Sequence, residues 1–330
     1  MKFFAYNVRP DEAPYFEKWQ AEHDIEVTLT SDFLTADTVI RAADYNGISA
    51  LQTIPYDAAL FAKMERLNLP YLALRNVGID NVDLVAAETH GVKLSNVPAY
   101  SPYAIAEFGV LQAMNLRRRT KAIANQQLHG EFHWSPDFMG TEMRHQTVGV
   151  VGVGKIGRQA IALYTGLGAT VIAFDPSWQG SDAGITYVSN LETLLKQADI
   201  VTLHAPGRPE NDHLLNAEAF ALMKPTTIVI NTARGSLVDL NALKRALDTH
   251  QIAGAALDAF EDETAEMQQI NSHAPFSEPL LADLAKRDNV LLSPHMAFHT
   301  ETAVTNMVNE SLMSLMAFNQ ENQAEFELRY

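Results

Sequence analysis

The sequence predicts an α/β protein made of two doubly wound parallel-sheet domains, each Rossmann-like or flavodoxin-like, with a cleft between them. Short β-rich segments alternate with amphipathic helical segments along the whole chain, which is the pattern of parallel sheets. The length of 330 residues exceeds one simple core and fits two domains of about 150 residues each. The composition, 47% hydrophobic and 19% charged, is that of an ordinary globular protein.

The first hundred residues contain a first series of predicted strands with helices between them. The strands are expected at Lys2–Asn7, Glu26–Thr30, Gly47–Thr53, Tyr71–Val77 and Lys93–Asn96. The helices include Pro14–Glu22 and Ala58–Leu67. The apolar run at the N-terminus is too short for a signal peptide, so we interpret it as the first strand.

A second series of strands and helices begins at Thr147. Its strands are expected at Thr147–Val151, Thr170–Asp175, Ile200–His204, Thr226–Asn231, Gly254–Asp258 and Asn289–Ser293. Its helices include Gly154–Thr165, Leu191–Gln197, Ala217–Met223 and Leu240–Asp248.

Two places along the chain predict domain boundaries. A turn-rich stretch from Asn96 to Pro102 precedes a helix expected from Tyr103 to about Leu116, with Ser101 as N-cap and Pro102 at its first position. The last predicted strand then runs into a helix at 303–318. We therefore expect one discontinuous domain, residues 1–100 with 300–330, and one continuous domain, residues 101–299. Clefts between two such domains are usual ligand sites.

Charge and cysteine content exclude several classes of function. The 24 basic and 40 acidic residues give a formal charge of −16, which argues against binding nucleic acid or an anionic membrane surface. The absence of cysteine excludes disulfides and thiolate catalysis and fits a cytoplasmic protein. No apolar run approaches the roughly 18 residues that span a bilayer. The histidines show no metal-ligand spacing, so we expect no metal.

A glycine-rich turn predicts a dinucleotide site. Gly152-Val153-Gly154-Lys155-Ile156-Gly157 fits G-x-G-x-x-G, follows an apolar strand and opens a helix. The first glycine permits the tight turn, the second lets the backbone approach a pyrophosphate, and the third lets helix pack on strand. The helix N-terminus offers N–H groups and partial positive charge to the anion. The alternative is a turn that is rich in glycine for packing only.

Asp175 predicts NAD rather than NADP as the cofactor. It ends the next strand, 23 positions after Gly152. A carboxylate at this place accepts hydrogen bonds from ribose hydroxyls and repels a 2′-phosphate. The residues that follow, Pro176 to Gln179, include no Arg or Lys. The alternative is an aspartate that only caps the turn before Pro176.

Three polar groups follow strands of the second series, at the sheet edge where ligands bind. They are Arg234, Asp258 with Glu263 five residues on, and His295. An arginine holds a carboxylate or carbonyl oxygen by charge-assisted hydrogen bonds, and a histidine beside a carboxylate donates a proton near neutral pH. Hydride reduction of a ketone needs both groups.

Each of these residues also has a structural interpretation. Arg234-Gly235 fits a turn that carries a surface charge. His295, after Pro294, fits a hydrogen-bonded loop histidine. Glu263 lies in the acidic run 261–263, which is typical of a solvated face. Their joint placement at strand ends favours the catalytic interpretation.

Over essentially its full length the chain resembles the NAD-dependent D-2-hydroxyacid dehydrogenases, in particular the D-lactate/D-2-hydroxyisocaproate dehydrogenase branch from lactic acid bacteria. Five segments carry the resemblance. They are Leu74–Asn81, Ser95–Pro102, Gly152–Gly157, Asn231–Gly235 and Ser293–Phe298.

The resemblance implies a role for each matching residue. His295 is the implied general acid/base, Glu263 its carboxylate partner, and Arg234 the anchor for the substrate carboxylate and carbonyl. The domain of residues 1–100 and 300–330 is the implied substrate-binding domain. The implied substrate-binding residues are Val77 and Gly78 through their amides, Tyr100, Leu51 and Phe298. The implied NAD contacts of the 101–299 domain are Gly152, Gly154, Lys155, Ile156, Gly157, Asp175, Ala205, Pro206, Asn211, Thr232, Ala233, Arg234 and Asp258.

Two positions bear on the choice of substrate. Leu51 stands where lactate-preferring relatives tend to have Tyr, and Phe298 stands where many relatives have Tyr. Smaller or more apolar side chains would open the pocket to branched or aromatic 2-keto acids. The alternatives are neutral core variation at both positions, and a D-lactate dehydrogenase with pyruvate as main substrate.

Other functions fit the same fold. One is an NAD-sensing, corepressor-like binding protein, although we find no extension that carries partner motifs. Another is a phosphoglycerate dehydrogenase, which the charge of −16 does not favour. The resemblance also implies a homodimer through the helix that begins at Tyr103, and a helix buried within one subunit would have the same pattern.

Overall fold

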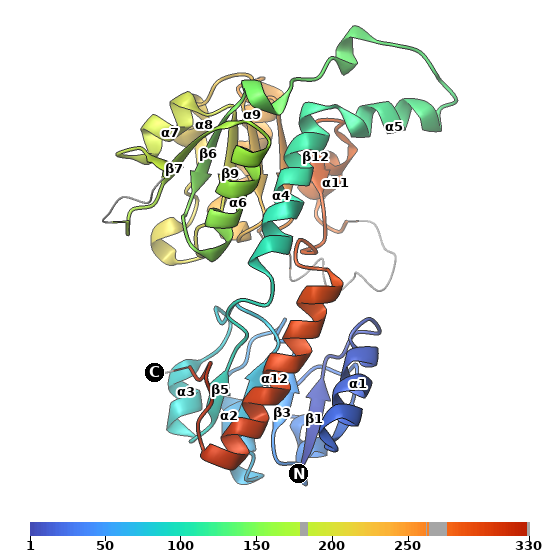
Figure 1. Cartoon of the computed structure of the whole chain (residues 1–330), viewed down its shortest axis with the longest axis vertical. Helices are drawn as coiled ribbons and strands as arrows, with labels where there is room; N and C mark the ends of the chain where they lie inside the picture. The colour runs from blue at the N-terminus through green and yellow to red at the C-terminus, as the bar shows by residue number, and fades with distance from the viewer. Residues whose placement is uncertain (179–183, 262, 264–275, 329–330) are drawn as a thin grey trace. The chain divides into compact units, whose positions relative to one another are not determined.

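The computed structural model describes residues 1–330 except 179–183, 262, 264–275 and 329–330. The chain divides into two compact units: unit 1, Met1–Ser101 with His299–Tyr330, and unit 2, Pro102–Phe298. Each unit contains one parallel β-sheet with helices on both faces (Figure 1). The predicted fold class, two doubly wound α/β domains, is confirmed.

Unit 1 is built on a five-stranded sheet with the strand order β2-β1-β3-β4-β5, and all its pairings are parallel. Its strands are β1 (Lys2–Tyr6), β2 (Glu26–Leu29), β3 (Ile48–Ala50), β4 (Tyr71–Leu74) and β5 (Lys93–Ser95). Its helices are α1 (Ala13–His23), η1 (Val39–Ala42), α2 (Ala58–Arg66), α3 (Leu84–Thr89) and α12 (Glu301–Glu321).

The sheet of unit 1 has an apolar core on each face. Successive residues of β1 point to opposite faces, as in any strand. Phe3 packs with α1 and α12 on one face, and Phe4 packs on the other face with side chains of α2 and α3. Both phenylalanines are buried. The long helix α12 thus returns the C-terminal part of the chain to the first domain, as Figure 1 shows.

A buried ion pair braces the carboxyl ends of the strands of unit 1. Arg75 directly follows β4, and its Nε donates to Glu12 Oε1 at 2.9 Å with both side chains fully buried. The same guanidinium donates to the carbonyls of Tyr6, the last residue of β1, and of Asn7 directly after it. A buried arginine is tolerated only when charge and N–H groups are matched in this way.

Unit 2 is built on a seven-stranded parallel sheet with the strand order β12-β11-β10-β9-β6-β7-β8. Its strands are β6 (Thr147–Val151), β7 (Thr170–Phe174), β8 (Thr186–Tyr187), β9 (Ile200–Leu203), β10 (Ile228–Asn231), β11 (Gly254–Leu257) and β12 (Val290–Leu292). Its helices include α4 (Pro102–Arg117), α5 (Thr120–Leu128), α6 (Lys155–Gly166), α7 (Leu191–Gln197), α8 (Ala217–Leu222), α9 (Leu240–Asp248) and α11 (Pro279–Lys286).

The core of unit 2 also lies on both faces of its sheet. Val148 and Val150 of β6 pack with α4 and α6, and Val151 packs on the face that α7, α8 and α9 cover. The order in which strands are added to the sheet reverses between β6 and β9. Strands β7 and β8 extend the sheet to one side of β6, and β9 to β12 extend it to the other side. Ligands of open α/β sheets bind at this kind of reversal.

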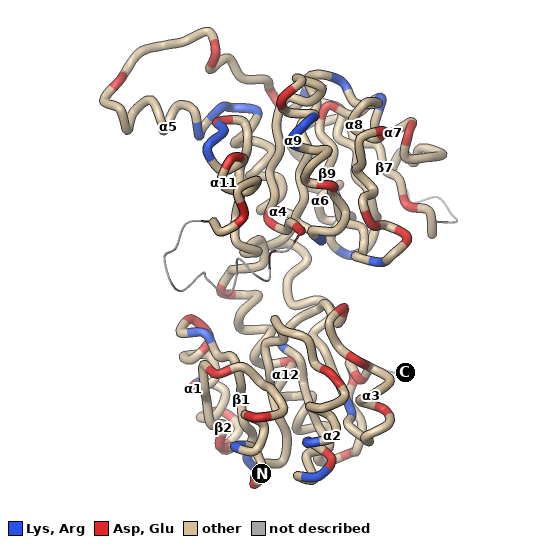
Figure 2. The backbone as a smooth tube through the Cα atoms, turned by 180° about the vertical axis from the view of Figure 1, so that it is seen from behind, with Lys and Arg blue, Asp and Glu red and all other residues tan. Residues whose placement is uncertain are grey.

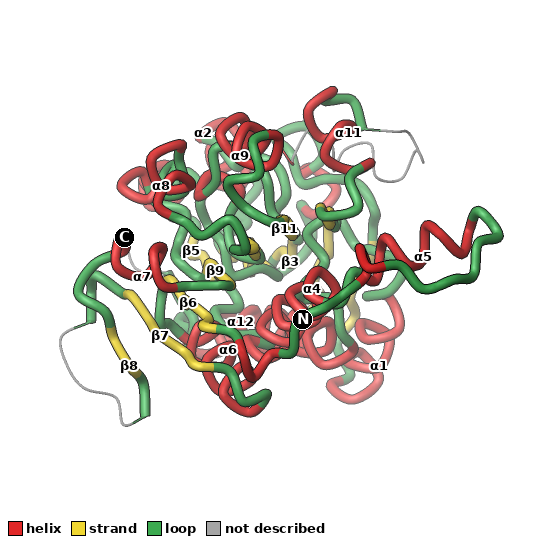
Figure 3. The backbone as a smooth tube through the Cα atoms, turned by 90° about the horizontal axis from the view of Figure 1, so that it is seen from above, coloured by secondary structure: helices red, strands yellow, loops and turns green. Residues whose placement is uncertain are grey.

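One segment of unit 2 projects from its body. In Figures 1 and 3, α5 and the residues after it, 129–140, extend away from the sheet. The base of α5 is held by Lys121, whose ammonium donates to the carbonyls of Ala285, Arg287 and Val290. Further along, Phe132 and Trp134 are more than nine-tenths exposed. We call residues 118–140 the arm.

Apart from Thr147–Val151, the strands are shorter than the sequence patterns predicted, and some helices were not predicted. The expected strand Gly47–Thr53 pairs only over Ile48–Ala50, because the residues after Ala50 turn toward neighbouring loops. Helix α5 buries none of its residues, so it lacks the apolar period that indicates a helix. Helices α3 and α11 are short, with six and eight residues, which leaves little periodicity to detect.

The charged residues of both signs are spread over the two units, as Figure 2 shows. Among the described residues, no helix combines the length and the apolar character needed to cross a membrane.

Candidate active site

The predicted polar residues of unit 2 follow the carboxyl ends of its parallel strands. The glycine turn follows β6, Asp175 follows β7, Ala205 follows β9, Thr232 and Arg234 follow β10, Asp258 follows β11, and His295 follows β12. Because these strands are parallel neighbours, the residues share one edge of the sheet.

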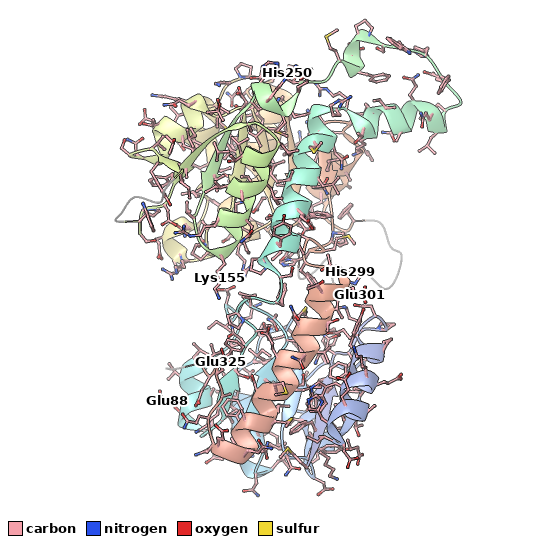
Figure 4. All side chains as sticks on the ribbon, viewed as in Figure 1. Glu88, Lys155, His250, His299, Glu301 and Glu325 are labelled. Atoms are coloured by element: carbon pink, nitrogen blue, oxygen red, sulfur yellow. The ribbon has the colours of Figure 1, made fainter. Side chains whose placement is uncertain are left out.

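The glycine turn between β6 and α6 has the geometry of a phosphate site. Gly152 has φ +90°, and a Cβ there would lie 2.7 Å from the carbonyl carbon of His204. A Cβ on Gly157 would lie 2.0 Å from the Gly152 oxygen, so only glycine lets α6 start this close to the strand. The position of a Cβ on Gly154 is open, and Lys155 is exposed at the first turn of α6 (Figure 4). An anion can therefore approach the helix N-terminus.

The Asp175 carboxylate caps its own turn and braces the glycine turn. Its Oδ2 accepts from the Val153 N–H at 2.8 Å, and its Oδ1 accepts from the N–H and hydroxyl of Ser177. Burial raises the Asp175 pKa, but these hydrogen bonds and nearby Arg158 outweigh it, so the pKa is lowered. A carboxylate oxygen accepts about two hydrogen bonds, which leaves Oδ2 with capacity for a ribose hydroxyl.

The loop after β9 lies against the glycine turn. Burial lowers the pKa of His204 to about 4, so its ring is neutral at pH 7. Its Nε2 lies 3.1 Å from Thr202 Oγ1, and its Nδ1 has no partner among the described residues. Asn211, predicted to contact NAD, donates its side-chain N–H to the Pro206 carbonyl and so closes the loop that contains Ala205.

The loop after β10 is organised by Asn231, which is fully buried. Its side-chain N–H group donates to the carbonyls of Arg234 and Ala259, and its oxygen accepts from the Ala233 N–H. The hydroxyl of Thr232 in this loop is buried and has no partner within the described part of the chain. A buried hydroxyl in this state is available to hydrogen-bond a ligand.

Close packing brings the Arg234 turn against the segment that leads to Glu263. A Cβ on Gly235 would lie 2.2 Å from the backbone of Phe260, so no other residue fits at that point. Arg234 donates its Nη1 to the Ala233 carbonyl at 2.9 Å. Its positive charge reaches His295, where it acts to lower the imidazole pKa. Arg234 and His295 are therefore electrostatic neighbours.

His295 and Glu263 form the hydrogen-bonded pair that the sequence predicted. His295 Nδ1 lies 2.9 Å from Glu263 Oε1, and both side chains are partly exposed. Burial lowers the His295 pKa, but the hydrogen bond and charge of Glu263, with the charge of Asp258, outweigh it, so the pKa is raised. The other ring nitrogen, Nε2, has no partner among the described residues. This geometry suits a proton donor.

Asp258 holds the loop that contains His295. Its Oδ1 accepts from the Ser293 hydroxyl and the Met296 N–H, and its Oδ2 accepts from the Ala297 N–H at 2.8 Å. His295 itself has φ +50°, in the left-handed region, and its N–H donates to the Asp258 carbonyl. The hydrogen bonds that Asp258 accepts from this loop offset the cost of that conformation. The buried Asp258 carboxylate therefore holds the backbone conformation of the loop that contains His295.

The remaining predicted residues lie in loops. In unit 1, Leu51 follows β3, Val77 and Gly78 follow β4, and Tyr100 lies one residue before the end of the first segment of the unit. Tyr100 is buried, while Leu51, Val77 and Gly78 are half-buried. Phe298 is the last residue of unit 2 and is half-buried.

Sequence reasoning missed the roles of Asn231 and His204. An asparagine that ends a buried apolar strand is a detectable signal, because its amide must find partners. His204 likewise ends an apolar strand, although nothing in the sequence shows that it is buried and neutral. Two of the buried side-chain atoms without a partner among the described residues, His204 Nδ1 and Thr232 Oγ1, lie on loops at the same sheet edge as the glycine turn. These features fit a dinucleotide as cofactor.

Comparison with known proteins shows the family of this chain. Residues 110–297 match the family model described as D-isomer specific 2-hydroxyacid dehydrogenase, NAD binding domain. The chain is 43% identical to a D-2-hydroxyacid dehydrogenase (NAD+) of Lacticaseibacillus paracasei, covering 99% of this chain and 98% of that one. It is 41% identical to a D-lactate dehydrogenase of Lactiplantibacillus plantarum, with both chains fully covered.

A solved structure is also similar to the whole chain. The structure of a D-2-hydroxyisocaproate dehydrogenase superposes with a TM-score of 0.93 at 43% identity and covers 99% of both chains. The resemblance predicted from the sequence and NAD as cofactor are confirmed. The chain therefore belongs to the family of D-isomer specific, NAD-dependent 2-hydroxyacid dehydrogenases.

Proposed function

We propose that this dehydrogenase reversibly reduces 2-keto acids to D-2-hydroxy acids with NADH and accepts a broad range of substrates, including branched and aromatic ones. The observation that carries the proposal is the hydrogen bond between His295 and Glu263 with the charge of Arg234 nearby. When bound, NADH supplies the hydride.

His295 donates the proton that the substrate oxygen needs. Its Nε2 has no partner among the described residues, so this atom is available to the substrate, while Nδ1 remains on Glu263. The raised pKa of His295 favours the protonated ring, which is the form that reduction requires. In the reverse direction the neutral ring accepts the proton from the hydroxy acid.

Arg234 binds the substrate carboxylate and polarises the carbonyl that is reduced. A guanidinium suits both tasks because its N–H groups form a planar fork that matches two oxygens. We assign the amides of Val77 and Gly78 to the same carboxylate, and Tyr100 to a contact with the substrate.

The residues of unit 2 predicted to contact NAD keep that assignment. Gly154, Lys155 and Ile156 at the start of α6 would bind the pyrophosphate. The free capacity of Asp175 Oδ2 suits a hydroxyl of the adenosine ribose, and its charge would repel a 2′-phosphate. The Thr232 hydroxyl and the loop at Ala205 would complete the cofactor site.

Leu51 and Phe298 support a preference for larger substrates. Neither side chain carries a hydroxyl, and both are only half-buried, so neither is a fully packed core residue. The relatives include enzymes named for a larger and for a smaller substrate, a D-2-hydroxyisocaproate dehydrogenase and D-lactate dehydrogenases. Pyruvate as the main substrate is the alternative that the experiments below distinguish.

The wild-type enzyme is expected to reduce 2-ketoisocaproate and phenylpyruvate with a higher kcat/KM than pyruvate, when NADH oxidation is followed at 340 nm. A higher value for pyruvate would overturn the preference and leave the reaction in place. If no 2-keto acid were reduced, the result would favour the alternative, a binding protein that uses this fold to sense NAD.

Leu51→Tyr is expected to lower the ratio of kcat/KM for 2-ketoisocaproate over pyruvate by about tenfold or more, because a larger side chain fills the pocket. Leu67→Tyr is the matched control, since Leu67 is also half-buried but ends helix α2. An unchanged ratio in Leu51→Tyr would show that position 51 does not select the substrate.

We also propose a homodimer in which α4 and the arm of unit 2 contact a second copy of the chain. Tyr103 and Leu111 of α4, together with Phe132 and Trp134 of the arm, expose large apolar side chains. A two-fold interface uses the same surface of both copies, so it covers these residues in each of the two chains. We place this dimer in the cytoplasm, since the chain contains no cysteine.

Light scattering is expected to give twice the chain mass of 36.4 kDa for the wild type. The double variant Phe132→Ser, Trp134→Ser is expected to shift the mass toward that of one chain at micromolar concentration. Val85→Ser, which changes an exposed valine on α3 of unit 1, is the control. A monomeric wild type, or a double variant that stays dimeric, would contradict this interface.

A further inference from the structure

The loop that contains His295 leaves one thioether exposed to solvent. Met296 directly follows His295 and is 40% exposed, whereas the next residue, Ala297, is buried. The chain contains no cysteine, so methionine supplies all of its sulfur. A hydroperoxide oxidises exposed thioethers in preference to buried ones. Met296 is therefore accessible to this chemistry.

Four other described methionines are exposed, but none of them adjoins a predicted catalytic residue. They are Met1 at the start of the chain, Met114 on α4, Met139 in the arm and Met313 on α12. Among the exposed methionines in the described ranges, oxidation at Met296 alone places a new polar atom next to the predicted proton donor.

Hydrogen bonds to Asp258 hold the backbone around the exposed thioether. The Met296 N–H donates to Asp258 Oδ1 at 3.0 Å, and the Ala297 N–H donates to Asp258 Oδ2 at 2.8 Å. The His295 N–H donates to the Asp258 carbonyl at 3.0 Å. Because the N–H groups of three successive residues are held in this way, a chemically changed Met296 stays beside His295.

We propose that Met296 is an oxidation site through which a hydroperoxide reversibly lowers the dehydrogenase activity. In the oxidation step the O–O bond of the peroxide breaks, and one oxygen forms the S=O bond of a methionine sulfoxide. The proton of the hydroperoxide moves to the other oxygen, which leaves as water or as an alcohol. The sulfur loses two electrons and the peroxide gains them.

The sulfoxide acts on the reaction through His295. A thioether is apolar and accepts hydrogen bonds weakly, whereas a sulfoxide is polar and its oxygen accepts them strongly. One residue away, this oxygen competes with the substrate oxygen for the N–H of the protonated imidazole. The loss of activity rests on the proposed function, because it acts through the proton donor named there, whereas the oxidation itself does not.

The test treats the wild type with hydrogen peroxide, removes the peroxide with catalase and measures kcat for the best 2-keto acid with NADH. We expect kcat to fall by about tenfold or more, as for a general acid that no longer reaches the substrate. Peptide mapping by mass spectrometry should show one added oxygen at Met296. Met296→Leu has no thioether at this place and should keep most of its own untreated kcat.

Met313→Leu is the matched control, because Met313 is 42% exposed and lies on α12 of unit 1. This variant should lose as much kcat as the wild type. Methionine sulfoxide reductases A and B, which act on the two sulfoxide epimers, should restore the kcat of the treated wild type. The dithiothreitol that these reductases need has no other target, because the chain contains no cysteine.

A second variant imitates the oxidised side chain without any oxidant. Met296→Gln has an unbranched side chain of similar length that ends in a carbonyl oxygen, which is a strong acceptor. It should lower kcat in the untreated enzyme, while the dissociation constant of NADH, measured by fluorescence, should stay close to that of the wild type.

Equal losses of kcat in the treated wild type and in Met296→Leu would overturn the inference. So would full kcat in a wild type that carries the sulfoxide at Met296, oxidation of other methionines that leaves Met296 intact, or wild-type kcat in Met296→Gln. An untreated wild type that reduces no 2-keto acid would overturn the proposed function and with it the effect on turnover, while the peptide map would still show whether Met296 is oxidised.

Discussion

His295→Gln is expected to lower kcat for 2-keto acid reduction by about 10²- to 10⁴-fold, the usual contribution of a general acid. Glutamine keeps a polar side chain of similar length but cannot deliver a proton near neutral pH. Its amide can still reach Glu263, so the loop that Asp258 holds should keep its conformation. The measurement is NADH oxidation at saturating keto acid, together with NADH binding by fluorescence, which should be unchanged.

His213→Gln provides a matched control for that loss. His213 also pairs with a glutamate of unit 2, because its Nε2 lies 2.5 Å from Glu261 Oε1. The predicted proton donor is His295 alone, so His213→Gln should retain kcat within a few-fold of wild type. A loss of less than tenfold in His295→Gln, or an equal loss in the control, would contradict the role of His295.

Arg234→Lys is expected to lower kcat/KM by about 10²- to 10³-fold, the range seen when one preorganised donor to a reacting oxygen is removed. Lysine keeps the charge but loses the planar fork that would bind carboxylate and carbonyl together. Both kcat and KM should change, since the same group binds the substrate and stabilises the charge that develops on its oxygen.

The control for Arg234→Lys is Arg245→Lys, on the exposed side of α9. It makes the same chemical change in the same unit, away from the strand-end loops, and should leave kcat/KM unchanged. Wild-type kcat/KM in Arg234→Lys would show that charge alone is sufficient and that the fork has no role.

The sequence predicted the fold and the strand-end residues because those features depend on local pattern. The strand Thr147–Val151 and the helices Leu191–Gln197 and Leu240–Asp248 have the predicted bounds. Glycines at fixed spacing between a strand and a helix leave few other conformations, which made the turn at Gly152 predictable. The same holds for Arg234 and His295, since each lies three residues after the end of a predicted strand in the structure.

Hydrogen bonds between distant loops could not be predicted in this way. The sequence did not predict that both oxygens of Asp258 accept hydrogen bonds from residues 293–297, and its assignment to the cofactor stays a prediction. Asp175 follows β7, as predicted, and its carboxylate also caps its own turn, which was the alternative interpretation of this residue. Asn96 has no pattern around it that indicates that its side chain donates to the Val77 carbonyl, 19 residues earlier. The arm is equally hidden, because it has no buried face and hence no apolar period.

The central claim is that Glu263 keeps His295 protonated for catalysis. The raised pKa of His295 means that keto-acid reduction persists to higher pH than an ordinary histidine would allow, and declines as pH rises through that pKa. Glu263→Gln removes the charge but keeps an acceptor for Nδ1, so the pKa should fall. Glu261→Gln is the control, because it removes an equal charge two residues before Glu263. Glu261 pairs with His213 and not with His295.

The pH dependence of kcat/KM for keto-acid reduction, compared between the wild type and these two variants, tests this claim most directly. We predict that the alkaline limb moves to lower pH in Glu263→Gln and stays in place in Glu261→Gln. An alkaline limb at the wild-type pH in Glu263→Gln would contradict the pairing, and with it the proposed source of the proton.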